Sequence, residues 1–361
     1  MLSISSSRGV YQVHFLESLK QVPSRLNTLL ANRQVVILSN PTIWDIYGVP
    51  FTKIWHDQLG DFDIVLMPDG ESFKSLSVYQ SLVLQIDALG LQRSAIIVAF
   101  GGGVVGDMAG FLAATLLRGI DWVQIPTTIL AMVDSSIGGK VAVNLPTGKN
   151  RLGAFYPPNM VCAPQEVIAT LSKQDIRSGL GEIIKHAILK DADLLQEILD
   201  APSIHEIKYW SEILERSCRV KAHIVEQDER EKGIRLALNL GHTIGHALEK
   251  LLNYQHLQHG ECVAFGLLVE LDWMVQQGWL VKEVWEIIDK IIKKLDMSII
   301  LRDIDKEAIF DAISFDKKFK YDMIELCVVH DLEHFEIQPF SKSNIWDLCQ
   351  SIHVLNQYSR G

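Results

Sequence analysis

Residues 94–118 read SAIIVAFGGGVVGDMAGFLAATLLR, and this stretch decides the fold. Its first part, Ala95–Phe100, is a continuous apolar run rich in Ile and Val, which is typical of a strand buried on both faces of a parallel sheet. Three glycines follow at 101–103, and an apolar segment with helical spacing begins near Asp107. A strand, a glycine turn and a helix in this order aim backbone N–H groups and a helix N-terminus at a phosphate. The stretch therefore predicts a phosphate-binding turn in an α/β domain.

The glycines also satisfy the G-x-G-x-x-G fingerprint of dinucleotide-binding turns, through Gly101, Gly103 and Gly106. Asp121 lies about where the acidic residue of that fingerprint is expected. The fingerprint belongs to the first βαβ unit of its fold, however, and at least two strand–helix units precede this one. A tight turn that needs glycine only for its backbone is the alternative. The strand before it and the helix after it favour a dinucleotide site.

The composition is that of an ordinary globular protein, and the length indicates two domains. The 361 residues are 48% hydrophobic and 22% charged, with a net charge of −10. This charge argues against nucleic acid or an anionic membrane as the main partner, although a locally basic pocket can still take a small anion. The five cysteines are widely spaced, which fits thiols in a reducing cytoplasm. With no signal-peptide pattern and no apolar run long enough to span a bilayer, we expect a cytoplasmic protein.

The first half of the chain alternates strands with helices. The expected strands are Gln34–Ser39, Asp63–Met67, Ala95–Phe100, Trp122–Ile125 and Met160–Ala163. This alternation predicts a parallel, doubly wound, Rossmann-like sheet in residues 1–171, with a ligand at the carboxyl ends of its strands.

From about Leu171 the strand alternation stops, and the second domain, residues 172–361, is expected to be mainly α-helical. Helical periodicity covers the ranges 175–190, 205–226, 236–252, 261–277 and 282–295. The segments 324–329 and 334–337 are expected to form a short hairpin, and 345–355 a last helix.

A glycine-rich segment at 135–158 carries a group of cationic and amide side chains. Lys140, Lys149, Asn150 and Arg151 lie among glycines at 138, 139, 148 and 153. Cations on loops supported by glycine suit a phosphate or a carboxylate. A plain basic surface loop is the alternative, but solvated loops rarely concentrate this much glycine between apolar residues.

Three segments of the helical half combine carboxylate and imidazole side chains. GLGEIIKHA, NLGHTIGHALE and LQHGECVAFG supply Glu182, His242, His246 and His259. Oxygen and nitrogen ligands of this kind suit a catalytic zinc ion, and three ligands leave a position open for substrate oxygens. His242 and His246 stand one helical turn apart and are both able to touch one metal. The spacing alone leaves open which two of the three histidines bind.

With these residues the chain resembles the 3-dehydroquinate synthases, members of the sugar phosphate cyclases. The resemblance runs from about Asp69 to Lys318. It rests on strings that occur in the same order as in the family: PDGESFKS, GGGVVGDMAG, RGIDWVQIPTT, MVDSSIGGK, GKN, GEIIKH, RLALNLGHTIGHALE, HGECVAFG and FDKK. It implies an NAD-binding α/β domain, a helical domain that binds metal and substrate, a homodimer, and one zinc ion, for which cobalt is an alternative.

The resemblance also implies roles for individual residues. The metal ligands would be Glu182, His242 and His259, with His246 a proton-transfer residue near the substrate. NAD would be held by Asn40, Glu71, Lys74, Gly102, Gly103, Val104, Asp107, Thr127, Thr128 and Lys149. The phosphate, carboxylate and hydroxyls of the substrate would meet Arg118, Asp134, Lys140, Asn150, Lys185, Lys221, Arg235, Asn239 and one of Lys317 and Lys318.

The implied reaction converts 3-deoxy-D-arabino-heptulosonate 7-phosphate to 3-dehydroquinate and phosphate. NAD oxidises one hydroxyl to a ketone and so acidifies the neighbouring C–H. Phosphate is then eliminated, the ketone is reduced again, and an aldol step closes the carbocycle. NAD is regenerated, so no net redox change occurs.

Other enzyme classes remain as alternatives. The family usually has GGKTG where this chain has GGKVA (138–142), and KNRLGAFYPP resembles the 2-epi-5-epi-valiolone synthases. A related cyclase, of that type or of the 2-deoxy-scyllo-inosose synthase type, is therefore the second interpretation, although Arg235 suits a substrate carboxylate. Metal-dependent polyol dehydrogenases need no clamp for anions, so the cationic residues speak against them. A non-catalytic binding protein is the weakest interpretation.

Overall fold

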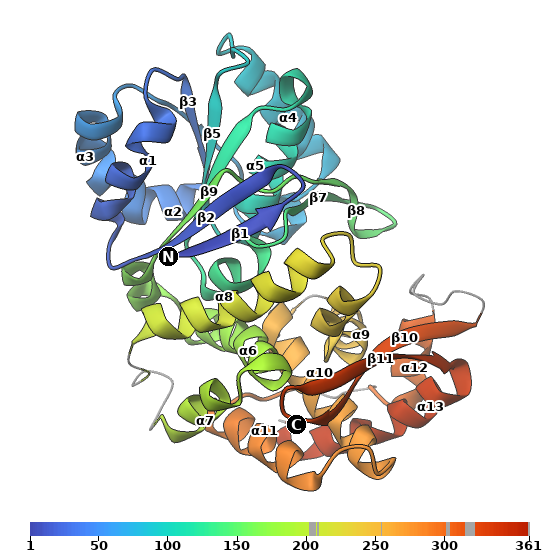
Figure 1. The fold of residues 1–361 in the computed structure, drawn as a ribbon. Helices are drawn as coiled ribbons and strands as arrows, with labels where there is room; N and C mark the ends of the chain where they lie inside the picture. Colours follow the sequence, from blue (N-terminus) through green and yellow to red (C-terminus); the bar gives the residue numbers. More distant parts are fainter. Residues whose placement is uncertain (202–206, 208, 254, 301–303, 315–321, 360–361) are drawn as a thin grey trace. The chain divides into compact units, whose positions relative to one another are not determined.

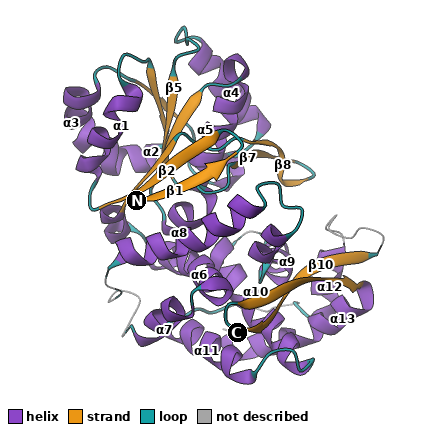
Figure 2. Cartoon of the chain, viewed as in Figure 1, coloured by secondary structure: helices purple, strands orange, loops and turns teal. Residues whose placement is uncertain are grey.

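A computed structural model describes the chain except residues 202–206, 208, 254, 301–303, 315–321 and 360–361. The chain divides into two compact units, Met1–Leu171 and Ser172–Gly361. Their boundary coincides with the domain boundary expected from the sequence. Figure 2 shows that strands concentrate in the first unit and helices in the second.

The first unit is built on a seven-stranded sheet with the order β1-β2-β9-β6-β5-β3-β4. Neighbouring strands are parallel, except that β1 runs antiparallel to β2 (Figure 1). The strands are β1 (Leu2–Ser6), β2 (Gly9–Leu16), β3 (Val35–Ser39), β4 (Asp63–Leu66), β5 (Ile96–Gly101), β6 (Asp121–Pro126) and β9 (Met160–Pro164). Among the parallel strands, the order reverses between β3 and β5, and such switch points hold ligands at the carboxyl ends of the strands. The predicted doubly wound fold is confirmed.

The helices of the first unit cover this sheet, and α5 (Gly103–Thr115) packs closely on it. The other α-helices of this unit precede α5 in the sequence: α1 (Val22–Leu30), α2 (Pro41–Ile43), α3 (Val49–Leu59) and α4 (Leu76–Asp87). Helix α5 begins at Gly103, earlier than the expected start near Asp107, because the glycines themselves form its first turn. Gly106 lets the helix approach β6, since a Cβ there would lie 2.2 Å from Nε2 of the buried Gln124. The glycine turn therefore serves packing as well as the open helix N-terminus.

Two hairpins of the first unit were not expected. One is β1–β2, and the other is β7 (Lys140–Leu145) with β8 (Gly148–Phe155), where the sequence indicated loops. The glycines around β7 masked a short alternation in which Val141 and Val143 are buried and their neighbours are not. The cationic residues of this segment therefore stand on a hairpin that packs on α5, not on a loop.

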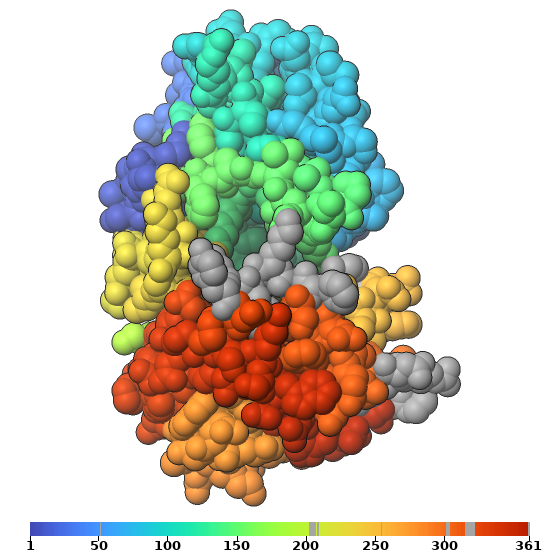
Figure 3. All heavy atoms as spheres, turned by 90° about the vertical axis from the view of Figure 1, so that its right-hand side faces the viewer, coloured from blue at the N-terminus to red at the C-terminus, as the bar shows by residue number. Residues whose placement is uncertain are grey.

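The second unit is a helical assembly around α10 (His259–Gln276), which is buried along most of its length. The other helices are α6 (Lys173–Lys190), α7 (Ala192–Asp200), α8 (Trp210–Gln227), α9 (His242–Leu251), α11 (Lys282–Lys294), α12 (Lys306–Ser314) and α13 (Lys342–Gln350). The expected hairpin is formed by β10 (Met323–Asp331) and β11 (His334–Ser341). In Figure 3, the hairpin and the neighbouring C-terminal elements form one continuous orange-to-red face. In the described part of the chain, every helix is too short or too polar to cross a membrane.

The helix expected over 236–252 is split in two. A 3-10 helix, η7 (Ile234–Asn239), precedes α9, and Gly241 lies between them with a φ of 77°. This left-handed conformation suits glycine, which lacks the Cβ that penalises it in other residues. The sequence did not predict helix α7. The start of the helix expected over 205–226 lies outside the described residues. The last helix ends at Gln350 and is followed by a 3-10 helix that extends to Tyr358. The break at Gly241 makes His242 the first residue of α9.

Three helices of the second unit touch backbone to backbone at glycines. A Cβ on Gly260 of α10 would lie 1.7 Å from the carbonyl oxygen of Ser178, and one on Gly181 of α6 would lie 1.9 Å from that of Gly260. A Cβ on Gly266 would lie 1.9 Å from the carbonyl oxygen of Gly241. Helices α6 and α9 therefore each lie as close to α10 as the backbones allow.

We predict that Gly260→Ala destabilises the second unit by about 3 kcal/mol, the upper part of the usual range for overpacking, because the methyl group meets backbone that cannot rotate away. Gly90→Ala is the matched control: Gly90 has a φ of 69° and open space around it. Its cost should be about 1–2 kcal/mol, from backbone strain alone. Urea denaturation of both variants would test this, and an equal or smaller loss for Gly260→Ala would contradict it.

Candidate functional site

In the first unit, the carboxyl ends of β3, β5 and β6 carry the residues expected to hold a cofactor. Asn40 follows β3, and its Oδ1 accepts a hydrogen bond of 3.0 Å from the backbone N–H of Ile43. Thr128 follows β6, and its Oγ1 accepts a hydrogen bond of 3.1 Å from Ala131. Asn40 and Thr128 thus cap the turns that follow these strands.

The N-terminus of α5 lacks a side-chain cap, because its N-cap residue is Gly102. The hydroxyl Oγ1 of Thr127, buried at the end of β6, has no hydrogen-bond partner among the described residues. Helix N-termini leave N–H groups unsatisfied and carry a partial positive charge. An anion with oxygen atoms fits this position, and a phosphate of a dinucleotide is such an anion.

Next to this N-terminus, Lys74 connects residues from three segments. Its ammonium contacts Oδ2 of Asp107 on α5 and donates a hydrogen bond of 2.6 Å to Oδ1 of Asn150 on β8. Burial raises the pKa of Asp107, and the Lys74 ammonium opposes that rise. The side chain of Lys74 is itself buried, so this ion pair is shielded from solvent.

Asn144 at the end of β7 extends this group, and the sequence analysis missed it. Its backbone N–H donates to the carbonyl of Lys74 at 2.7 Å, and its Nδ2 donates to Oε1 of Glu71 at 2.8 Å. Its Oδ1 accepts a hydrogen bond of 2.8 Å from the backbone N–H of Asn150. The only signal in the sequence was an amide at the end of a short alternating strand.

Other expected residues of the first unit are less closely placed. Lys140 is exposed on β7, Lys149 is half-buried on β8, and Asp134 is half-buried after β6. Arg118 follows the C-terminal end of α5, about 20 Å from its N-terminus at 1.5 Å per residue, so the structure does not bring it to Lys74 and Asp107. Asp121 begins β6, at the opposite end of the sheet from the glycine turn, and pairs with Arg33 at 2.9 Å. It is therefore not the acidic residue of a dinucleotide fingerprint.

In the second unit, hydrogen bonds fix the starts of α6 and α10 relative to each other. The backbone N–H of Gly260 donates to Oγ of Ser178 at 3.1 Å. Gln174 donates to Glu261 at 2.9 Å, and Gln258 donates to Asp175 at 2.8 Å. These contacts hold the first turn of α10, which carries His259, beside the middle of α6, which carries Glu182.

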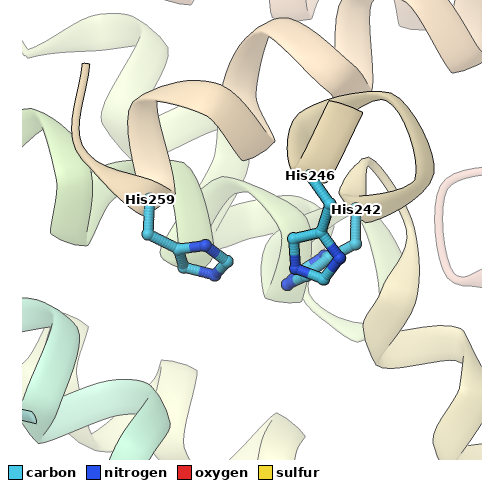
Figure 4. Close-up of side chains that lie close together, drawn as sticks. All are labelled: His242, His246 and His259. Atoms are coloured by element: carbon cyan, nitrogen blue, oxygen red, sulfur yellow. The ribbon is translucent and has the colours of Figure 1, made fainter. Parts of the chain in front are cut away.

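The carboxylate of Glu182 faces two histidines. Its Oε1 lies 3.5 Å from Nε2 of His242 and 3.5 Å from Nε2 of His259, and it has no hydrogen-bond partner among the described residues. Figure 4 shows His246 beside them, and ligand atoms of the three histidines all lie within 4.8 Å of one another. A fully buried carboxylate oxygen without a hydrogen bond in the described part of the chain, close to two imidazole nitrogens, is a donor set that suits a divalent metal.

The other ring nitrogens of the two histidines are also engaged. Nδ1 of His242 lies 3.2 Å from the carbonyl oxygen of Leu240, and Nδ1 of His259 lies 3.4 Å from Oε1 of Glu249. A proton on each Nδ1 leaves Nε2 with its lone pair directed at the site. Both rings are therefore oriented as ligands.

The pKa values of His259 and Glu182 are shifted by the charged groups around them. Burial lowers the pKa of His259, but the carboxylates of Glu182 and Glu249 outweigh it and raise that pKa to about 10. Burial raises the pKa of Glu182, yet Lys185 and the two histidines hold it well below its usual range. Glu182, Glu249 and His259 thus influence one another's charge within a single buried group.

Four further expected residues of this unit supply cationic and amide groups. Three of them are buried, namely Lys185, Lys221 and Arg235, and Asn239 is half-buried. The ammonium of Lys185 contacts Oε2 of Glu182. Their elements α6, α8 and η7 pack on one another. The Arg235 guanidinium donates to the carbonyl of Glu229, and Asn239 donates to Oε1 of Glu231 at 3.1 Å. Lys317 and Lys318 lie outside the described residues.

The sequence analysis missed three acidic residues of this unit: Glu231, Glu249 and Glu270. Glu270 is buried on α10, and its carboxylate accepts hydrogen bonds of 2.7, 3.1 and 3.2 Å from the backbone N–H groups of Gly241, Thr243 and Ile244. It therefore caps α9 at the turn that carries His242. The residues that Glu231, Glu249 and Glu270 contact are distant in sequence or separated from them by a turn. Only Glu249 had a signal in the sequence, because it belongs to the NLGHTIGHALE string.

Two family models match consecutive parts of the chain. The model described as 3-dehydroquinate synthase N-terminal matches residues 64–178, and the one described as 3-dehydroquinate synthase C-terminal matches residues 179–319. The 3-dehydroquinate synthase of Nostoc punctiforme is 40% identical over 329 residues, which cover 89% of this chain and 90% of that protein. That of Thermoanaerobacter pseudethanolicus is 36% identical over 350 residues, which cover 95% and 98%.

Solved structures resemble the chain over nearly its full length. A 2-deoxy-scyllo-inosose synthase complexed with carbaglucose-6-phosphate, NAD+ and Co2+ has a TM-score of 0.85 and 25% identity, covering 97% of this chain and 99% of that one. A 2-epi-5-epi-valiolone synthase from Streptomyces hygroscopicus, with NAD+ and Zn2+ bound, shares the fold with a TM-score of 0.83 at 23% identity, covering 96% and 97%. Together with the family models and the relatives, the fold and the residues described above show that the chain belongs to the 3-dehydroquinate synthase family.

Proposed function

We propose that this protein is a 3-dehydroquinate synthase, a lyase that converts 3-deoxy-D-arabino-heptulosonate 7-phosphate to 3-dehydroquinate and phosphate with NAD and a divalent metal. The observation that carries the metal is Oε1 of Glu182, which is buried, has no hydrogen bond to any residue that the structure describes, and lies 3.5 Å from Nε2 of both His242 and His259. The inosose synthase noted above contains NAD+ and Co2+, which supports the same two cofactors here.

The residues present fit both groups. Glu182, His242 and His259 would hold the metal, which when bound supplies a Lewis acid for substrate oxygens. The uncapped N-terminus of α5 and the free hydroxyl of Thr127 would hold a phosphate of NAD, with Glu71, Lys74 and Asp107 beside it. NAD supplies a hydride acceptor that is restored later in the same reaction.

The chain's own residues would position the substrate and move its protons. Lys185, Lys221, Arg235 and Asn239 in the second unit would bind its anionic ends and hydroxyls. For Lys140 and Asn150 of the first unit, a role at the substrate rests on the family resemblance. His246, half-buried beside the two ligand histidines, would accept and return protons. Roles for Arg118, Asp134, Lys317 and Lys318 rest on the family resemblance alone.

A second candidate is a related cyclase that acts on a substrate without a carboxylate. The observations in its favour are the GGKVA segment and the 25% identity to a 2-deoxy-scyllo-inosose synthase. Against it stand the higher identity to 3-dehydroquinate synthases and the buried guanidinium of Arg235, which suits a carboxylate. Phosphate release from the heptulosonate phosphate, sedoheptulose 7-phosphate and glucose 6-phosphate would separate the candidates.

The metal assignment predicts that His259→Ala loses its divalent ion, because a nitrogen ligand and a partner of Glu182 disappear together. Elemental analysis of the purified protein should find one zinc or cobalt ion per wild-type chain and far less in the variant. His330→Ala, which alters a histidine on the β10–β11 hairpin, is the control and should keep the ion. Full metal content in His259→Ala would refute the ligand set.

The cofactor assignment predicts that NAD is used without being consumed. Phosphate should be released from the heptulosonate phosphate in many turnovers per bound NAD, with no steady growth of NADH absorbance. Removal of NAD by charcoal should abolish phosphate release, and its return should restore it. Stoichiometric formation of NADH would place the protein among the dehydrogenases instead.

For Arg235→Ala we predict a lower kcat/KM for the heptulosonate phosphate, equivalent to a loss of about 2–5 kcal/mol of binding free energy in the transition state, because a substrate carboxylate would lose a buried charged partner. Arg235→Lys should restore only part of the loss, since an ammonium lacks the planar fork of donors. Zinc content and NAD affinity should stay near those of the wild type. An unchanged kcat/KM in Arg235→Ala would favour the cyclases whose substrates lack a carboxylate.

A further inference from the structure

Glu249 is a buried carboxylate for which neither the sequence nor the family resemblance supplied a role. It is 6% exposed, and its Oε1 lies 3.4 Å from Nδ1 of His259. His242, His246 and Glu249 occupy positions i, i+4 and i+7 of α9, so they lie on one face of that helix. The same face that carries two of the histidines thus also reaches the third one, on α10.

Burial of this charge needs a partner. A carboxylate removed from water costs several kcal/mol of free energy unless hydrogen bonds and opposite charge offset the loss. Glu182, the other buried carboxylate of this group, forms an ion pair with Lys185. The N–H of His259 Nδ1 is the donor that Glu249 faces, and it becomes more acidic and a better donor when Nε2 binds a cation.

The two ligand histidines are supported differently. Nδ1 of His242 lies 3.2 Å from the neutral carbonyl oxygen of Leu240, whereas Nδ1 of His259 faces the charged carboxylate of Glu249. A carboxylate on the far nitrogen fixes the tautomer of an imidazole, orients its ring and raises the basicity of the nitrogen that faces the metal. The stronger of the two nitrogen ligands should therefore be His259.

We propose that Glu249 is a positioning residue of the metal centre, which holds the proton on Nδ1 of His259 and so directs Nε2 of His259 to the metal ion. This inference rests on the proposed function, because it presupposes a divalent ion at Glu182, His242 and His259. It assigns Glu249 no contact with the ion or the substrate.

The test compares metal affinities of the apo-protein, measured by competition with a chromophoric chelator for Zn2+ and for Co2+. Glu249→Gln keeps the shape and one acceptor oxygen but removes the charge, and we expect it to weaken binding roughly 10- to 100-fold. Asp289→Asn is the matched control: Asp289 is a buried carboxylate of α11 that accepts a hydrogen bond from Tyr358 at 2.6 Å. This control should bind metal as the wild type does, even if its thermal stability falls.

A second measurement needs no folded variant at Glu249. Nitrogen NMR of the zinc-loaded wild-type protein, labelled at histidine, should show a proton on Nδ1 and zinc on Nε2 of His259, with the ring assigned through its bonds to the His259 backbone. Equal metal affinity of wild type and Glu249→Gln, or zinc on Nδ1 of His259, would overturn the proposal while leaving the proposed function intact. A wild-type chain that binds neither ion would overturn both.

Discussion

The candidate metal-ligand group depends on how closely the backbones of α6 and α9 each approach that of α10. Glycines at 181, 241, 260 and 266 mark the contacts, and a methyl group at 181, 260 or 266 would collide with a backbone carbonyl. The proposed ligand residues are the immediate neighbours of these glycines: Glu182 follows Gly181, His242 follows Gly241, and His259 precedes Gly260. The short side chains of Glu and His reach one point because the helices that carry them touch.

Such close packing excludes water and makes charge the next constraint. Glu182 and Glu249 are both buried within this group, and Lys185 forms an ion pair with Glu182. In a low-dielectric interior, buried carboxylates favour a proton or a cation close to them, and a divalent ion between the proposed ligands would supply positive charge. The carboxylate of Glu270 is stabilised differently, because backbone N–H groups at the start of α9 surround it. The helix contacts and the acidic side chains therefore create the demand for a metal together.

The sequence predicted the elements whose signals are local. Apolar runs marked β3, β5 and β6, and the glycines after β5 marked an open helix N-terminus. The β7–β8 hairpin was missed because two buried valines give a weak alternation inside a glycine-rich segment. The set of Glu182, His242, His246 and His259 was visible from residue type, but Glu249 and Asn144 were not singled out, since their roles come from partners that the fold brings near. The roles of side chains outside the motifs depend on tertiary contacts, and the spacing of residues in the sequence does not reveal these contacts.

In the first unit, residues expected to serve separate purposes belong to one hydrogen-bonded group. Lys74 and Asp107 were expected at NAD and Asn150 at the substrate, yet Lys74 contacts both of them, and Asn144 ties Glu71 to the backbone of Asn150. A displacement of the β7–β8 hairpin would therefore disturb the cofactor residues as well. A reaction that reuses its NAD in each turnover needs the cofactor and the substrate anion to be held at the same time. Under the proposed function, a shared lysine, buried between a carboxylate and an amide, would couple the two tasks more directly than separate pockets would.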